Sequence, residues 1–206
     1  MKENPWNNID LDDYENHMKL DSVKQLQVMN NIMYDQFYSY NTPNIMILGI
    51  AGGNGLNHIN ADKIEKVYGI DINKDYLDEC KKRYPNLDNI FCPLQIDLQD
   101  EDAVFPNADI VIANLLIEYI GYDNFKRVIK KVNPTYVSCL IQINQDSTFV
   151  SDSPYLDVFK DLDQIHHQMS EEELTQSMQS INYNMIYINE SELPNGKKLV
   201  RLDYKR

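Results

Sequence analysis

Apolar residues along the chain form short strand-like runs that alternate with segments of helical period. The first five runs are strand-sized, and they lie at 45–50, 66–71, 89–95, 109–113 and 136–143. Strands that alternate with helices are typical of a parallel sheet with right-handed crossovers. Two more runs, 183–188 and 198–204, are joined through Pro194-Asn195-Gly196, which indicates an antiparallel hairpin. The pattern predicts a doubly wound, Rossmann-like α/β sheet of seven strands that ends in this hairpin.

Residues 10 to 40 precede the first strand and have helical periodicity. Asp10 or Asp12 is expected to cap a short helix that places Tyr14, His17 and Met18 on one face. A second helix is expected to begin at Ser22, which forms a capping box with Gln25, and to end at 41–43. We expect one domain, 1–206, in which 1–42 is a helical cap and 43–206 is the Rossmann-like core.

The other helices are predicted from capping residues and apolar spacing. A helix is expected at 54–61, others after the caps Asn73 and Asp123, and a last one after a capping box of Ser170 and Glu173. The apolar segment 115–120 is expected to end at Gly121. Residues 144–169 lack a clear period and are expected to form a functional loop that contains a short helix.

The first strand runs directly into a glycine-rich turn with Gly49, Gly52, Gly53 and Gly55. Such a turn allows a backbone to approach a bound nucleotide closely. The dinucleotide fingerprint G-x-G-x-x-G lacks its third glycine here, so the turn gives an NAD enzyme little support. The lysine of a Walker loop is also absent, which argues against phosphoryl transfer from ATP.

Charge and composition restrict the partners. The net charge of −13 disfavours nucleic acid and anionic membrane surfaces. No apolar run is long enough to span a bilayer, and the first residues have no apolar signal segment. Cys80, Cys92 and Cys139 are isolated, so neither a disulfide framework nor a thiolate metal site is expected. His166-His167 is expected at the exposed start of a helical region, without metal. We expect a cytoplasmic protein with no metal.

The segment L-G-I-A-G-G-N-G, residues 48–55, resembles the first motif of the class I S-adenosylmethionine-dependent methyltransferases, in a variant found in bacterial members. Gly49 stands where the family has an acid, and Ala51 replaces the first glycine of its triplet. The resemblance implies a Rossmann-like core with a final antiparallel hairpin. It also implies S-adenosyl-L-methionine as methyl donor and S-adenosyl-L-homocysteine as product.

The same resemblance implies roles for individual residues. Asp71 matches the acid that binds both ribose hydroxyls, Asp97 with Leu98 matches the adenine site, and Asn114 matches the motif that faces the reacting end. Residues 13–18 resemble a lid segment over the cofactor. The cofactor-binding residues expected on this basis are Gly49, Ala51, Gly53, Gly55, Asp71, Ile72, Asp97, Leu98, Asn114, Tyr14 and Met18.

The methyl acceptor is less defined by the sequence. The D/N-P-P-Y motif of enzymes that methylate amino groups of nucleic acids is replaced by N-L-L-I at 114–117. A small-molecule or peptide-borne nucleophile is expected instead. No catalytic residue is assigned, and the candidates are Glu118, Tyr119, His17 and Tyr155. Two alternatives stay open: a catalytically silent cofactor-binding or assembly module, and a related nucleotide-using enzyme such as an aminopropyl transferase or an NAD dehydrogenase. The pattern does not predict an oligomeric state.

Overall fold

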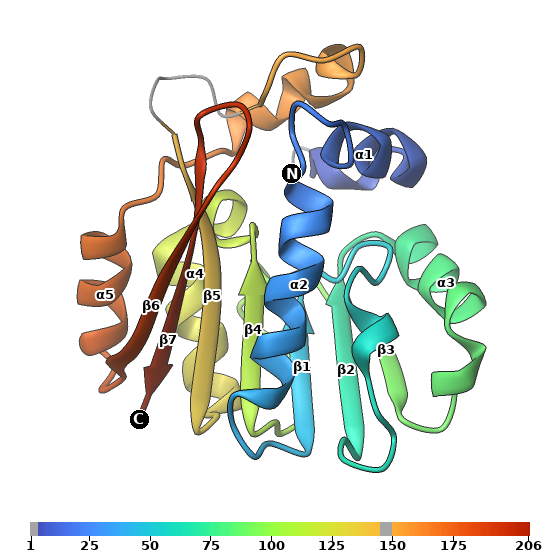
Figure 1. Ribbon diagram of the computed structural model, residues 1–206. Coiled ribbons are helices and arrows are strands. Elements are labelled where there is room, and N and C mark those ends of the chain that lie inside the picture. Colours follow the sequence, from blue (N-terminus) through green and yellow to red (C-terminus); the bar gives the residue numbers. More distant parts are fainter. Residues whose placement is uncertain (1–3, 145–149) are drawn as a thin grey trace.

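A twisted sheet of seven strands in the order β3-β2-β1-β4-β5-β7-β6 forms the centre of the computed structural model, which describes residues 4–144 and 150–206 (Figure 1). The strands are β1 (Asn44–Leu48), β2 (Lys66–Asp71), β3 (Phe91–Gln95), β4 (Ile110–Asn114), β5 (Tyr136–Ile143), β6 (Asn184–Glu192) and β7 (Lys198–Lys205). Neighbours among β1 to β5 pair in parallel, whereas β7 is antiparallel to both β5 and β6. The predicted doubly wound sheet with a terminal hairpin is confirmed.

Helices cover both faces of the sheet, because each buried strand places successive side chains on opposite faces. In β1, Ile45 and Ile47 pack in one apolar cluster with α2 and α3, and Met46 and Leu48 pack in another with α4 and α5. The helices are α1 (Leu11–Met18), α2 (Gln25–Tyr38), α3 (Lys74–Arg83), α4 (Ile117–Val132) and α5 (Glu171–Gln179). Short 3-10 helices are η1 (Pro5–Asn7), η2 (Leu56–His58), η3 (Pro85–Leu87) and η4 (Leu156–Gln164).

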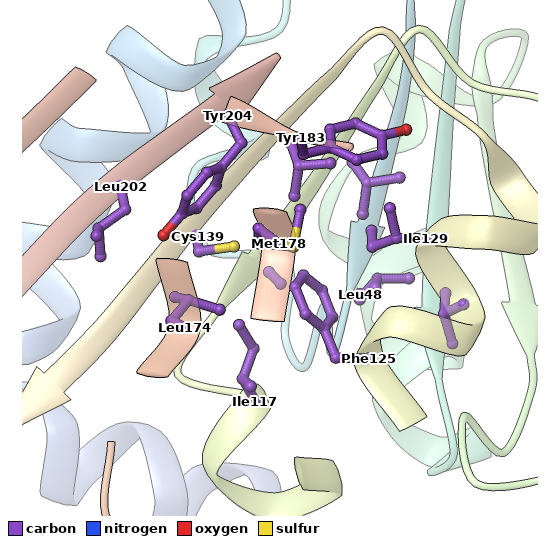
Figure 2. Packing of buried hydrophobic residues seen from close by; sticks show 14 of the residues in the cluster. Leu48, Ile117, Phe125, Ile129, Cys139, Leu174, Met178, Tyr183, Leu202 and Tyr204 are labelled. Carbon is purple, nitrogen blue, oxygen red and sulfur yellow. The ribbon is translucent and has the colours of Figure 1, made fainter. Parts of the chain in front are cut away.

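Figure 2 shows the cluster on the side of α4 and α5. Phe125 and Ile129 of α4 and Met178 of α5 point toward the buried side chains of the sheet. Cys139 is fully buried here in β5. Among the described residues, no helix is both long and apolar enough to cross a bilayer.

The predicted capping residues that begin α1, α3 and α5 are confirmed. Asp10 accepts hydrogen bonds from the backbone amides of Asp12 and Asp13, which selects Asp10 over Asp12 as the cap. Asn73 caps α3 in the same way, and Ser170 accepts from the amide of Glu173 at the start of α5. The loop 144–169 contains η4 as its expected short helix, and residues 145–149 of that loop lie outside the described residues.

Three boundaries differ from the prediction. The helix α2 begins at Gln25 and not at Ser22, because Val23 is buried in the preceding turn and Lys24 adopts a left-handed conformation with φ of 54°. The helix expected at 54–61 is only the 3-10 turn η2. Helix α4 begins at Ile117, and its break lies at Gly121 (φ 74°, ψ 162°), whereas Asp123 pairs with Lys126 inside the helix.

Candidate functional site

The carboxyl ends of β1, β2 and β4, with the segment that follows β3, surround a cavity with an empty volume of about 660 Å³, which we call the strand-end cavity. This is the place where open parallel sheets bind ligands. Residues expected from the sequence that line the cavity are Tyr14, Gly49, Ala51, Asp71, Ile72, Asp97, Leu98, Asn114 and Tyr119.

Asp71 is the best-defined acid of this cavity. Its carboxylate oxygens each accept a backbone hydrogen bond, Oδ2 from Ala51 and Oδ1 from Asn73, both at 2.9 Å. The side chain is buried, and burial raises the pKa of Asp71 to about 6 although the backbone hydrogen bonds oppose that shift. A carboxylate has about four acceptor positions, so the acid is held rigidly and keeps capacity for a ligand.

The backbone beside Asp71 is strained. Ala51 and Leu115 line the cavity with positive φ angles of 47° and 52°, a conformation that residues with a side chain rarely adopt. The Ala51 amide is held by Asp71, and the Leu115 amide donates to the Leu140 carbonyl at 2.8 Å. Backbone strain that persists against such a cost clusters at ligand-binding sites.

Asn114 ends β4 and its side chain is fixed by Gln36 of α2. The two amides donate to each other at 2.9 Å in both directions, and Gln36 also donates to the Ser138 hydroxyl at 2.9 Å. Gln36 is fully buried. No sequence motif selects Gln36, since its role depends on contacts with β4 and β5.

The adenine-site residues of the resemblance lie at another wall of the cavity. Leu98 is buried, whereas Asp97 is exposed and its carboxylate accepts a hydrogen bond from the Gln99 amide at 2.8 Å. The two residues follow β3 and thus reach the same cavity as Asp71.

The N-terminal segment with α1 lies above the strand ends (Figure 1), and its residues Asn4, Trp6 and Tyr14 line the cavity. Trp6 contacts Tyr14 and Tyr119 edge-to-face, with ring centroids 5.6 and 5.0 Å apart. Asn73 donates to the Trp6 carbonyl at 3.0 Å, and the Tyr76 hydroxyl donates to the Ile9 carbonyl at 2.8 Å. Trp6 was not predicted as a site residue. The one signal in the sequence was that Trp6 is the only tryptophan of the chain and follows Pro5.

Helix α1 is also tied to the glycine turn. Arg83 of α3 pairs with Glu15 of α1 at 2.5 Å and donates to the Gly52 carbonyl at 3.3 Å. A Cβ at Gly52 would lie 2.1 Å from the Glu15 carboxylate, so this glycine leaves room for the pair. The structure therefore places 13–18 across the turn, in the position expected of a lid.

Three residues expected at the cofactor do not line the strand-end cavity. A Cβ at Gly53 would meet Tyr84, Cys80 and Leu56, and one at Gly55 would meet Met33, so these glycines permit close packing with α3 and α2. Met18 is buried on the other side of Tyr14. Contact of these three with a cofactor stays a prediction.

A second cavity, with an empty volume of about 500 Å³, lies beside the first, and we call it the cap chamber. The walls that both cavities share are Trp6, Tyr14, Leu115 and Tyr119. The rest of the chamber comes from segments far apart in the sequence, namely α1, the start of α2, α4, β5, η4 and the residues Val150 and His166. The chamber includes three of the proposed catalytic candidates, Glu118, Tyr119 and His17.

Glu118 is buried with 4% of its surface exposed, so the alternative of a solvent-facing glutamate is wrong. Its Oε2 is the one buried side-chain oxygen or nitrogen without a hydrogen-bond partner among the described residues. Burial raises the pKa of Glu118 to about 8, and a hydrogen bond from its own backbone amide only partly opposes this. Burial, followed by the charge of the nearby Glu118 carboxylate, raises the pKa of the Tyr119 phenol, which stays protonated.

Two histidines line the chamber in the neutral form. His17 is buried and its Nδ1 lies 2.8 Å from the Ser153 hydroxyl. Burial and the charge of Lys197 lower the pKa of His17, and burial, His167 and Lys197 lower the pKa of His166 to about 4. The prediction of an exposed pair at a helix start is wrong for His166, which follows η4 and turns into the chamber, but His167 is exposed.

The fourth candidate, Tyr155, lines neither cavity and packs against the cluster of Ile9, Phe159 and Leu162. In the part of the chain that the structure describes, no group of three or more histidines, cysteines or acids is placed to hold a metal.

Comparison with known proteins gives a result for the fold only. No family model matches the chain, and no curated protein matches it in sequence. A solved structure of the N-methyltransferase NodS from Bradyrhizobium japonicum WM9, in complex with S-adenosyl-L-homocysteine, superposes with a TM-score of 0.68 at 10% identity over 99% of both chains. Geranyl diphosphate C-methyltransferase from Streptomyces coelicolor A3(2) gives 0.66 at 11% identity over 87% of this chain and 77% of its own.

The chain has the class I S-adenosylmethionine-dependent methyltransferase fold. The [4+2]-cyclase SpnF has a similar structure, with a TM-score of 0.66 at 7% identity over 87% of this chain and 82% of its own. A methyltransferase fold therefore does not by itself define the reaction, which has to be argued from the site.

Proposed function

We propose that this protein is an S-adenosyl-L-methionine-dependent methyltransferase that acts on a small-molecule or peptide-borne nucleophile. The observation that carries the proposal is Asp71, a buried carboxylate at the end of β2 whose two oxygens are oriented by the amides of Ala51 and Asn73. The strand-end cavity is the site proposed for the donor.

The free acceptor positions of Asp71 suit a pair of neighbouring hydroxyls. A ribose presents its two hydroxyls side by side, and hydrogen bonds to an ionised acceptor are stronger than those between neutral groups. The strained Ala51 brings its backbone to the same place without a long side chain. Leu98 provides an apolar surface at the wall where the resemblance places adenine.

The donor supplies a methyl group on a sulfonium, which is activated for direct displacement. The protein then contributes mainly alignment and exclusion of water, and the aromatic wall of Trp6, Tyr14 and Tyr119 supports both. Aromatic faces also attract the positive sulfonium. The protein's net charge of −13 favours a cationic ligand in general.

Isothermal titration with S-adenosyl-L-homocysteine tests the proposal. We expect wild type to bind at micromolar concentration, and Asp71→Ala to bind at least about 30-fold more weakly because the ribose loses a charged acceptor. Asp100→Ala removes an exposed carboxylate from a neighbouring loop and serves as the matched control, with binding unchanged within twofold.

Thermal unfolding shows whether Asp71→Ala is folded at the titration temperature. An absence of wild-type binding at millimolar ligand overturns the proposal. Titrations with NADH and with decarboxylated S-adenosylmethionine test the two related nucleotide enzymes, and tighter binding of either ligand transfers the assignment to it.

A further inference from the structure

The cap chamber is separated from the strand-end cavity by Trp6, Tyr14 and Tyr119, and it contains the buried acid Glu118. Glu118 Oε2 is buried without a partner among the described residues, and an unpartnered buried carboxyl is costly. Among residues 4–144 and 150–206, no lysine or arginine lines the chamber. The partner of this oxygen is therefore expected to come from a ligand.

The other groups around the chamber define what this ligand resembles. Phe159, Leu162 and Met18 present apolar surface, whereas Trp6, Tyr14 and Tyr119 present aromatic rings. The histidines His17 and His166 have lowered pKa values and are neutral near pH 7. Lys197 acts on both histidines from outside the lining residues. Gln25 and Gln142 also line the chamber, where the Gln25 side-chain amide donates a hydrogen bond to the side-chain carbonyl of Gln142. The chamber thus combines apolar and aromatic surface with neutral polar groups and one acidic side chain, Glu118.

We propose that the cap chamber binds the methyl acceptor, that this acceptor is a small amine on an apolar or aromatic body, and that Glu118 holds its nitrogen. The inference rests on the proposed function, because the strand-end cavity is taken as the donor site. Glu118 lines the chamber and does not line the strand-end cavity, which assigns it to the acceptor and not to the amino group of the donor.

An amine fits better than the other acceptor classes. A carboxylate or phosphate would face Glu118 with no lysine or arginine among the described residues that line the chamber. A neutral hydroxyl would satisfy the orphan oxygen by one hydrogen bond, but it would not use the aromatic rings that attract a cation. An ammonium group satisfies both, and its charge favours the ionised form of Glu118.

The proton and electron balance of the step is simple. The ammonium of the acceptor gives one proton to the ionised Glu118 carboxylate, which leaves a neutral amine with a free electron pair. That pair forms the new nitrogen–carbon bond to the methyl group while the carbon–sulfur bond breaks and its electrons stay on sulfur. The product leaves as a methylated ammonium, and Glu118 returns its proton to water.

Binding measurements on the protein saturated with S-adenosyl-L-homocysteine test this assignment. The probes form three sets, and each set compares an amine, an alcohol and a carboxylate on a similar apolar body. The sets are 2-phenylethylamine with 2-phenylethanol and phenylacetate, benzylamine with benzyl alcohol and benzoate, and hexylamine with hexanol and hexanoate. We expect wild type to bind at least one amine about tenfold or more tightly than its alcohol and to reject the carboxylates.

Glu118→Gln keeps the shape of the side chain and removes its charge. We expect this variant to lose at least about tenfold in amine affinity, with alcohol affinity and S-adenosyl-L-homocysteine affinity unchanged within threefold. Glu101→Gln removes an exposed carboxylate elsewhere and is expected to behave as wild type. With an amine that is methylated, Glu118→Gln should also shift the acid limb of the kcat/KM pH profile, which a purely structural residue would not do.

Three results overturn the amine assignment: equal affinity for amine and alcohol in wild type, an amine preference that survives in Glu118→Gln, or no amine bound although S-adenosyl-L-homocysteine binds. Failure of wild type to bind S-adenosyl-L-homocysteine instead overturns the proposed function. The amine series is also measured on the protein without S-adenosyl-L-homocysteine. This measurement shows whether amines bind through Glu118 even if S-adenosyl-L-homocysteine does not bind.

Discussion

The strand-end cavity and the cap chamber lie side by side and share Trp6, Tyr14 and Tyr119, but their polar groups are satisfied in different ways. In the first, Asp71 and Asn114 are held by backbone amides and by Gln36. In the second, Glu118 is buried with an oxygen that has no partner among the described residues. The polar groups of the strand-end cavity are thus oriented before a ligand binds, whereas the cap chamber has a carboxylate oxygen that can still accept a hydrogen bond.

This difference has a physical meaning. Polar groups that are already oriented lose little entropy when a ligand arrives, which suits a cofactor that the whole fold is built to hold. A buried acid without a partner destabilises the empty protein, and a ligand of opposite charge removes that penalty. The cost of Glu118 in the free protein is consistent with a role in selecting the acceptor.

The largest effect is expected from Glu118→Gln on stability at high pH. Because the pKa of Glu118 is raised from 4.5 to about 8 in the folded protein, the folded state binds this proton more tightly than the unfolded state. The free energy of unfolding of wild type therefore falls as pH rises from about 4.5 to 8, and the variant lacks this loss.

We expect Glu118→Gln to be more stable than wild type by roughly 2–5 kcal/mol at pH 9 and to differ by less than about 1 kcal/mol at pH 5. Urea unfolding at both pH values measures the difference. The same stability difference at both values would show that Glu118 is not buried as an isolated acid.

Gln36→Leu is expected to lower the free energy of unfolding, whereas Glu118→Gln is expected to raise it at high pH. The substitution removes the hydrogen-bond partner that α2 gives to the Asn114 amide, which lines the strand-end cavity. It also removes one of the two hydrogen bonds of the Ser138 hydroxyl, which still donates to Asp203. We expect a loss of about 2–3 kcal/mol in the free energy of unfolding. Gln179→Leu, at an exposed position at the end of α5, is the control and should change it by less than about 0.5 kcal/mol. Equal effects of the two substitutions would contradict the role of Gln36.

Asp71 is expected to make cofactor affinity depend on pH. Its pKa of about 6 in the ligand-free protein means that the carboxylate is protonated below pH 6, and a protonated acid is a poorer acceptor for two hydroxyls. We expect S-adenosyl-L-homocysteine to bind about tenfold more weakly at pH 5 than at pH 7. Titrations at both values measure this, and Glu118→Gln should keep the same dependence. A dependence that also persists in Asp71→Ala would have another origin.

The smallest effect is expected from the ion pair that ties α1 over the turn. Arg83→Gln removes the ion pair with Glu15. Because both side chains of this pair are only partly buried, the free energy of unfolding should fall by less than about 1 kcal/mol. A looser α1 should release S-adenosyl-L-homocysteine a few times faster. Stopped-flow displacement measures this rate. Lys82→Gln, which breaks an exposed pair with Glu79, is the control and should leave the rate unchanged.

Much of the sheet and part of the strand-end cavity could be predicted because the signals are local. Alternating apolar runs define strands, and a glycine turn after β1 and an acid at the end of β2 meet at one edge when those strands are parallel. The same local reasoning could not separate the two uses of Gly53 and Gly55, which line neither cavity, since a glycine needed for close packing looks identical in sequence to one needed for a ligand.

The cap chamber was outside the reach of local patterns. Its walls include residues of η1, α1, α2, α4, β5 and η4, and Glu118 becomes buried only where these segments meet. A glutamate at the start of an amphipathic helix is exposed by default, so no periodicity predicts its burial.

The sequence by itself determined the α/β architecture, the terminal hairpin and the position of Asp71, because each follows from the order of strands and the residues at their ends. Only the tertiary structure decided that Trp6 lines the strand-end cavity, that Gln36 fixes Asn114, and that Glu118 Oε2 is buried without a hydrogen-bond partner in residues 4–144 and 150–206. These three features arise from contacts between distant segments, and such contacts depend on side-chain packing that residue spacing does not encode.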